Sequence, residues 1–153
     1  MFDLQFLLNC SYAMVPALGF AMAFNVPSCQ LVFCAVGGFL GYFVKFFLIH
    51  HGLHIIWSTF VAAACVSFYG IGWGQKYRAH PKVITVAAII HMIPGTFAYN
   101  TMVAIVAIAS GHFTDQTLSV AAENGLKTLF ILGAIAFGLA SPSMLIYRRK
   151  PVV

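Results

Sequence analysis

The sequence is poor in charged residues, and acidic residues are the rarest of them. Only 7% of the 153 residues are charged, and Asp and Glu together number 3. Soluble domains carry roughly 25% charged residues. With 61% hydrophobic residues and a mean hydropathy of +0.94, the chain cannot present a surface that water tolerates. The composition therefore excludes a soluble domain and predicts an all-α polytopic membrane protein.

Motifs for catalysis and for metal binding are also missing. The sequence contains no G-x-S-x-G, P-loop or other nucleophile motif, so we do not expect an enzyme. All four cysteines lie inside apolar segments without the paired spacing of metal ligands, which is typical of buried hydrophobic residues. His50 and His54 share a helix face, but no glutamate accompanies them and Gly52 interrupts the helix. Neither a metal nor another cofactor is expected.

The net charge of +5 comes from basic residues that flank apolar segments. Lys76, Arg78 and Lys82 lie in one short loop, and 148–150 follow the last apolar segment. Such clusters set the orientation of a membrane protein, whereas a nucleic-acid partner would require a basic face on a folded surface. Both clusters should be cytoplasmic, and two spans separate them. We therefore predict an external N-terminus, a cytoplasmic C-terminus and no nucleic-acid partner.

Five apolar segments are long enough to cross the lipid bilayer, because a spanning helix needs about 20 apolar residues. The fourth segment is interrupted at Pro94-Gly95, and the first contains Pro16 and Gly19. An alternative folds Pro94-Gly95 into a re-entrant hairpin and leaves four full crossings. We predict a single integral-membrane domain over residues 1–153, with spans at 4–25, 28–50, 53–73, 83–109 and 126–147.

The interrupted fourth span contains the first candidate binding site. Pro94 lies twelve residues beyond Lys82, which is about 18 Å along a helix and near the middle of a hydrocarbon core about 30 Å thick. Proline removes one backbone hydrogen bond, and Gly95 lowers the cost of unwinding. A half-helix that starts there presents unpaired N–H groups and a partial positive charge. We interpret the segment as a carboxylate site formed by Pro94, Gly95, Thr96, Tyr99 and Asn100; the alternative is a plain proline kink.

The second and third spans contain a further candidate. Lys45 is the only Lys or Arg within a span before the final helix, and Ser58 and Thr59 lie at a similar depth. Lys45 is the counter-charge for an anion in one interpretation and a residue that snorkels to the interface in the other. No Asp or Glu lies in the core of any span. His91 is therefore the candidate for proton coupling, and a hydrogen-bonded packing histidine is its alternative interpretation.

The chain contains the strings VPALGFAMAFNVP, WSTF and HPKVITVAAIIHMIPGTFAY. Together these strings resemble the threonine/serine exporter family, specifically the small subunit of its split form. The similarity runs over roughly residues 15–151. His91 and Ile56 depart from the family, in which proline and an acidic residue are usual at these positions. The family's shared positions fall here on Pro16, Gly19, Asn25, Pro27, Trp57, Ser58, Thr59, His80, Pro81, Lys82, Pro94, Gly95 and Tyr99.

The resemblance implies a subunit of a secondary transporter that exports small carboxylates across the bacterial cytoplasmic (inner) membrane. Succinate and related dicarboxylates, or threonine and serine, are the substrates that it implies. It also implies a larger membrane subunit of the same family as the partner, which could supply the missing acidic groups. The alternatives are a homo-oligomeric channel or uniporter for small anions, and an assembly subunit that does not itself transport.

Overall fold

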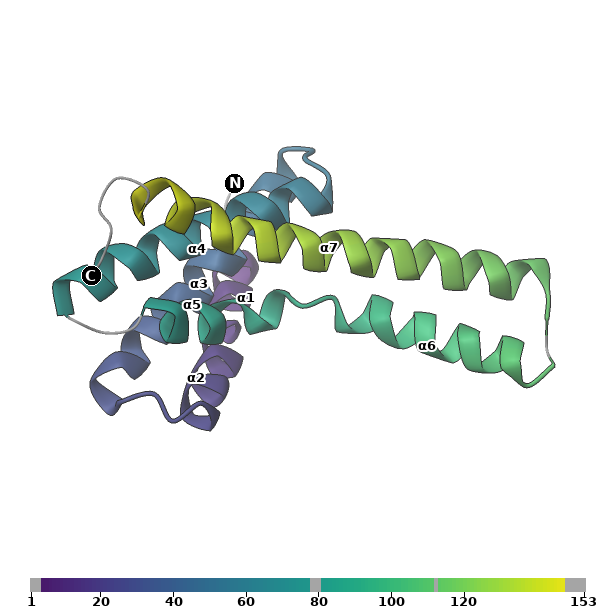
Figure 1. Ribbon diagram of the computed structural model, residues 1–153, viewed down its shortest axis with the longest axis horizontal. Helices are drawn as coiled ribbons and strands as arrows, with labels where there is room; N and C mark the ends of the chain where they lie inside the picture. Colours follow the sequence, from purple (N-terminus) through teal and green to yellow (C-terminus); the bar gives the residue numbers. More distant parts are fainter. Residues whose placement is uncertain (1–3, 78–80, 112, 148–153) are drawn as a thin grey trace. The chain divides into compact units, whose positions relative to one another are not determined.

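The computed structural model describes residues 4–77, 81–111 and 113–147, and every regular element in these ranges is helical (Figure 1). The predicted all-α fold is therefore confirmed for this part of the chain. In order, the elements are α1 (Leu4–Tyr12), α2 (Met14–Ala23), α3 (Ser28–His50), α4 (Ile55–Tyr77), α5 (Pro81–Ile89), the 3-10 helix η1 (Ile90–Met92), α6 (Gly95–Ala109) and α7 (Asp115–Tyr147).

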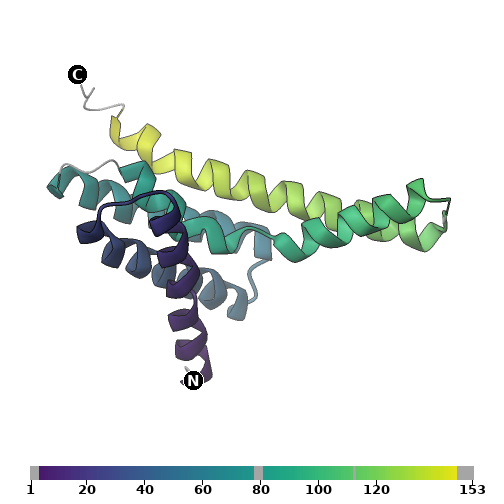
Figure 2. The same cartoon turned by 90° about the horizontal axis from the view of Figure 1, so that it is seen from below.

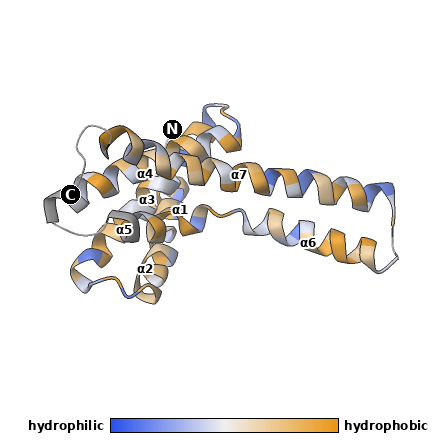
Figure 3. Ribbon diagram, in the orientation of Figure 1, coloured by the Kyte–Doolittle hydropathy of each residue, from blue (hydrophilic) through white to orange (hydrophobic). Residues whose placement is uncertain are grey.

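The helices have the length and composition of membrane spans. Four candidates pass this test when α1 and α2 count as one, and residues 84–92 with α6 make a fifth if they form one broken span. Hydrophobic residues predominate along the helices, with hydrophilic residues gathered in the N-terminal part of α7 (Figure 3). The multi-pass membrane fold is thus confirmed. The orientation stays a prediction, and Arg78, His80 and 148–150 lie outside the described residues.

The chain divides into two compact units. The first unit, Met1–Met92 and Ala134–Val153, contains α1 to α5, η1 and the C-terminal part of α7. The second unit, Ile93–Gly133, contains α6 and the N-terminal part of α7. The single-domain organisation of the whole chain stays a prediction.

Small residues on α3 form the centre of the first unit. This helix packs against α2, α4 and α5, and Figure 2 shows α1 and α2 running across the direction of the other helices of the unit. A Cβ added at Gly37 would lie 2.8 Å from the Ala88 Cβ, and one at Gly38 would lie 2.7 Å from the Ala17 Cβ. Glycine therefore lets α2 and α5 approach α3 more closely than any side chain would permit.

The C-terminal part of α7 packs on α4 through another close contact. A Cβ at Gly138 would lie 2.7 Å from the backbone oxygen of Phe60, and the Ser67 hydroxyl donates a hydrogen bond to the Leu139 carbonyl at 2.9 Å. Pro142 inside α7 has no N–H for the Gly138 carbonyl. The Ser141 hydroxyl donates to this same oxygen at 3.1 Å, so the helix continues through the proline.

The predicted interruption of the first span appears one turn before its proline. Because Pro16 has no N–H, the Tyr12 carbonyl loses its usual donor, and α1 ends at Tyr12. Ala13 keeps a helical conformation, with φ −66° and ψ −18°, so the break is mild and α2 follows directly. At the other end, Asn25 with φ 55° terminates α2 in the left-handed region that favours Gly and Asn.

The last helix begins at Asp115, eleven residues before the start of the predicted span at 126. The extra turns are polar, and hydrogen bonds at the helix start stabilise them. The Thr114 amide donates to the Thr117 hydroxyl at 3.0 Å, and the Thr117 amide donates to the Thr114 hydroxyl at 3.2 Å. This reciprocal pair is a capping arrangement, which the hydropathy of the segment alone does not indicate.

Candidate functional site

The predicted interruption at Pro94-Gly95 is present. The α-helix ends at Ile89, one 3-10 turn follows, and α6 begins at Gly95. Pro94 is buried and has φ −79° and ψ 64°, which lies outside the helical region. The Gly95 amide turns back to the Ile93 carbonyl at 2.8 Å. The new helix starts one residue earlier than the sequence predicts, at Gly95 instead of Thr96.

At the start of α6, two backbone N–H groups donate no hydrogen bond to any described residue. The Ala98 amide donates to the Pro94 carbonyl at 3.1 Å, whereas the amides of Thr96 and Phe97 make no such bond. No side chain caps this end, and Gly95 and Thr96 are exposed. The arrangement provides two free donors and the positive end of a helix dipole. Its role in binding a carboxylate stays a prediction.

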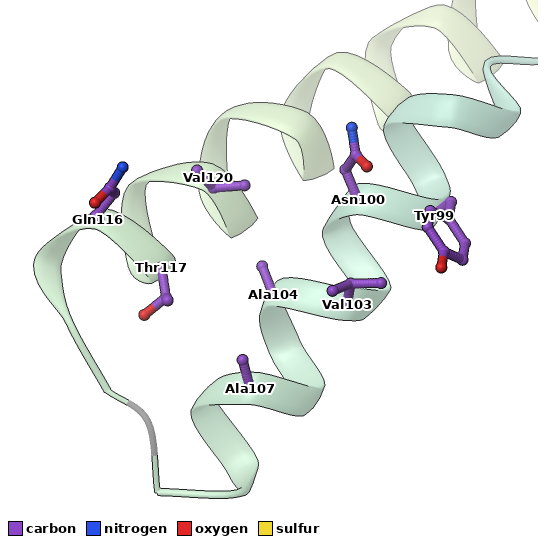
Figure 4. A pocket seen from close by; sticks show the side chains of 8 residues that line it. All are labelled: Tyr99, Asn100, Val103, Ala104, Ala107, Gln116, Thr117 and Val120. Carbon is purple, nitrogen blue, oxygen red and sulfur yellow. The ribbon is translucent and has the colours of Figure 1, made fainter.

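A groove of about 400 Å³ lies between α6 and the N-terminal part of α7 (Figure 4). The side chains of Ala104, Ala107 and Thr117 face the space between the two helices, whereas the Tyr99 ring lies at its edge. Tyr99 is 68% exposed. The groove is lined by Tyr99, Asn100, Val103, Ala104, Ala107, Gln116, Thr117 and Val120.

The groove contains only two of the five residues predicted around the interruption. Tyr99 and Asn100 line it, whereas Pro94, Gly95 and Thr96 precede it on the chain. Sequence analysis missed the polar groups of Gln116 and Thr117. The short connection between α6 and α7 could have indicated them, because a short loop places two consecutive helices side by side and antiparallel.

The predicted hydroxyl pair on α4 is fully buried and hydrogen-bonded within its own helix. Ser58 donates to the His54 carbonyl at 3.1 Å, and Thr59 donates to the Ile55 carbonyl at 2.7 Å. Lys45 makes no hydrogen bond with either hydroxyl among the described residues. The two hydroxyls therefore pack in the bundle with their donors already used.

Lys45 lies on the inner face of α3. The buried positions Cys34, Gly38 and Gly41 follow a helical spacing that Lys45 continues, and Lys45 itself is half-buried. A Cβ at Gly41 would lie 3.1 Å from the Cγ2 of Val66 and 3.5 Å from the Cε of Met92, so this face lies against both α4 and η1. The side chain does not lie on the exposed face that includes Phe46.

His91 lies in η1, opposite this face. Its ring centroid is 6.2 Å from that of Tyr42, and the next residue, Met92, lies beside Gly41 on the face that Lys45 continues. The Ala88 carbonyl is near the ring, but both ring nitrogens are buried and neither makes a hydrogen bond with a described residue. Both interpretations of His91, proton coupling and packing, stay predictions.

The candidate residues thus fall into two groups. Lys45, Ser58, Thr59 and His91 belong to the first unit, and the five residues from Pro94 to Asn100 belong to the second. Sequence analysis missed Tyr42, although its position three residues before Lys45 puts both on one helix face. Among the described residues, no group of three or more His, Cys, Asp or Glu gathers as metal ligands would.

Comparisons with known proteins agree with these features. The model of the threonine/serine exporter family matches residues 9–145. An uncharacterized protein of Haemophilus influenzae is 44% identical over 152 residues, which cover 99% of this chain and 51% of the relative. The chain therefore spans about half the length of this curated relative. No solved structure matches. The chain belongs to the threonine/serine exporter family, a family of membrane transporters.

Proposed function

We propose that the chain is one subunit of a secondary transporter that exports small carboxylates across the bacterial inner membrane. Succinate and other dicarboxylates, or threonine and serine, are the proposed substrates. Membership of an exporter family supports transport in place of an enzymatic reaction. The observation that carries the choice of a carboxylate is the break at Pro94, which leaves the amides of Thr96 and Phe97 unpaired.

The start of α6 has the chemistry to bind an anionic group. A carboxylate accepts hydrogen bonds from backbone N–H groups, and a helix N-terminus adds a favourable dipole. Charge-assisted hydrogen bonds of this kind are roughly twice as strong as neutral ones. The neighbouring groove, with Tyr99 and Asn100 on its wall, has a volume within the range typical of small-molecule sites.

The remaining predicted residues supply charge. Lys45, with Ser58 and Thr59 behind it on α4, is proposed to attract the carboxylate, and His91 is proposed as the group that couples transport to protons. The break between η1 and α6 is the proposed hinge for alternating access, because interrupted helices move as separate halves.

The proposed partner is a larger membrane subunit of the same family. Two observations support it. The Haemophilus influenzae relative is about twice as long as this chain, and no Asp or Glu lies in the core of any predicted span. Acidic groups for ion coupling would then come from the partner. A homo-oligomeric channel and a non-transporting assembly subunit are the competing outcomes of the test.

Counterflow in liposomes tests this function. The chain, purified with the partner that accompanies it, is reconstituted, and exchange of labelled succinate and threonine is measured. We expect saturable exchange, and a loss of roughly tenfold to 100-fold in apparent affinity for Pro94→Ala, which restores a backbone donor and allows the helix to close. Pro27→Ala, at the start of α3, is the matched control.

Three results would contradict the proposal. If Pro94→Ala exchanges substrate as the unmodified protein does, at equal protein level, the start of α6 is not the binding site. Conductance steps instead of saturable exchange would favour the channel. Full transport by the partner without this chain would favour the assembly subunit.

A further inference from the structure

The His91 side chain is the most unusual polar group in the first unit. Both of its ring nitrogens are buried and without a hydrogen bond to any described residue. Leaving a buried donor or acceptor unpaired is destabilising, so native structures almost always pair such groups. Ring nitrogens that are buried and without a hydrogen bond to a described residue indicate a site for a hydrogen-bonding ligand.

Lys45 is the second unpaired group, and it faces the same place. It is half-buried, continues the inner face of α3 towards η1, and makes no hydrogen bond or ion pair within the described residues. No Asp or Glu lies in the core of any predicted span. A cation inside a membrane protein normally pairs with an anion or faces a polar cavity.

Tyr42 completes the cluster. It lies one turn before Lys45 on α3, its ring centroid is 6.2 Å from that of His91, and its hydroxyl makes no hydrogen bond within the described residues. The ammonium group, the phenol and one imidazole N–H are all donors. One charged donor and two neutral donors on α3 and η1 match the chemistry that a carboxylate requires.

We propose that Tyr42, Lys45 and His91 form a carboxylate-binding site in which the anionic group of the transported solute is the counter-ion of Lys45. The proposal rests on the proposed function and changes it in two respects. Tyr42 and His91 replace Ser58 and Thr59 as the groups that act with Lys45, because the two α4 hydroxyls already donate to their own helix. His91 binds the solute as a hydrogen-bond donor and is not the proton carrier.

A phosphate of a lipid headgroup shares this oxyanion chemistry. The inner-face position of Lys45, opposite η1, favours a solute that enters the bundle. The experiment separates the two sources by supplying succinate in nanodiscs of phosphatidylcholine, and phosphatidylglycerol in nanodiscs without succinate.

Binding of succinate to the purified protein, with its partner where one co-purifies, tests the site. We expect Lys45→Met to weaken binding by roughly tenfold to 100-fold, and Tyr42→Phe by a smaller factor. Succinamide, which has the same length without charge, should not bind. Lys127→Met is the matched control, because Lys127 already pairs with Glu123 on the exposed face of α7, and it should bind succinate as the unmodified protein does.

A second measurement guards against a variant that fails to fold. Lys45→Met should be as thermally stable as the unmodified protein, or more so, when succinate is absent, since it removes an unpaired charge. The added stability that succinate gives to the unmodified protein should disappear in this variant. A purely structural lysine would instead give a variant with lower stability and unchanged succinate binding.

The outcomes separate this site from the proposed function. Unchanged succinate binding by Lys45→Met, while the complex still transports carboxylates, overturns the site and leaves the function. Stabilisation by phosphatidylglycerol with none by succinate also overturns it. Binding of succinate that depends on Lys45, in a complex that transports no carboxylate, supports the site and contradicts the function.

Discussion

Side-chain size at the helix crossings of the first unit decides how closely its helices pack. Gly37, Gly38 and Gly138 each lie where an added Cβ would meet a fixed neighbouring group at under 3.0 Å. Gly19 on α2 has open space in the same position. Gly38 on α3 therefore has no room for a larger side chain, whereas Gly19 on α2 has.

Gly38→Ala should lower the free energy of unfolding by about 1–3 kcal/mol, the usual cost of overpacking. The new Cβ would lie 2.7 Å from the Ala17 Cβ and 3.0 Å from the Ala13 carbonyl oxygen, and neither group can rotate away. Gly19→Ala should instead be neutral or stabilising by about 0.5–1 kcal/mol, because alanine is the better helix former. Thermal unfolding in detergent compares the two; equal loss of stability would contradict the packing of α2 on α3.

The serines beside Pro142 permit a second test at this scale. Ser141→Ala leaves the Gly138 carbonyl without a donor and should cost about 0.5–1.5 kcal/mol. Ser143→Ala should cost less, because the Ala140 carbonyl that Ser143 bonds keeps its helical donor. In a chain that carries Pro142→Ala, the Ser141 effect should shrink, since the backbone amide returns. A double-mutant cycle on thermal unfolding measures this coupling, and an additive result would contradict it.

At the scale of elements, α7 is longer than a membrane requires. Its 33 residues correspond to about 50 Å of helix, against a hydrocarbon core of about 30 Å. The polar residues lie in its N-terminal part, and this part runs beside α6: Thr101 lies 3.4 Å from a Cβ at Gly125, and the Lys127 ammonium lies 5.8 Å from the Phe97 ring centroid. The polar N-terminal turns of α7 are therefore predicted to extend beyond the hydrocarbon core.

Cysteine labelling measures this depth. In a chain without its four native cysteines, Ser119→Cys should react with a membrane-impermeant maleimide added to intact cells, because the first turns of α7 extend into the external water. Phe137→Cys, at a position 71% exposed on the apolar part of the same helix, should not react, because lipid covers it. Labelling of Ser119→Cys only after permeabilisation would contradict the predicted orientation, and no labelling at all would contradict the extension of α7 into water.

At the scale of the whole molecule, the chain covers half of a longer relative. No Asp or Glu lies in the core of any predicted span. A transporter that couples export to protons or to cations generally requires carboxylates within the membrane. Both observations favour a functional assembly that includes a second membrane protein.

Affinity purification of the tagged chain from its native membrane should therefore recover a larger multi-span protein in fixed ratio to it. Reconstituted without that protein, the chain should give no saturable succinate exchange, and adding the protein should restore exchange. Native mass spectrometry gives the ratio of the two proteins. Recovery of the chain as a homo-oligomer that transports by itself would contradict this assembly.

Composition and local chemistry by themselves determined the solvent, the fold class and the break in the fourth span. A chain with 7% charged residues must place its helices in lipid. Pro94 disrupts the hydrogen bonds of its own helix whatever surrounds it. These properties depend on a residue and its near neighbours along the chain, so the printed sequence is sufficient for them.

Only the tertiary structure decided which of the polar residues lie near one another. Tyr42 lies beside His91, whereas Ser58 and Thr59 turn their donors back to their own helix. Similar depth in the membrane had suggested a different grouping. The physical reason is that the glycine contacts of α3 set its rotation against η1, and a rotation of one helix position would move Lys45 to another face.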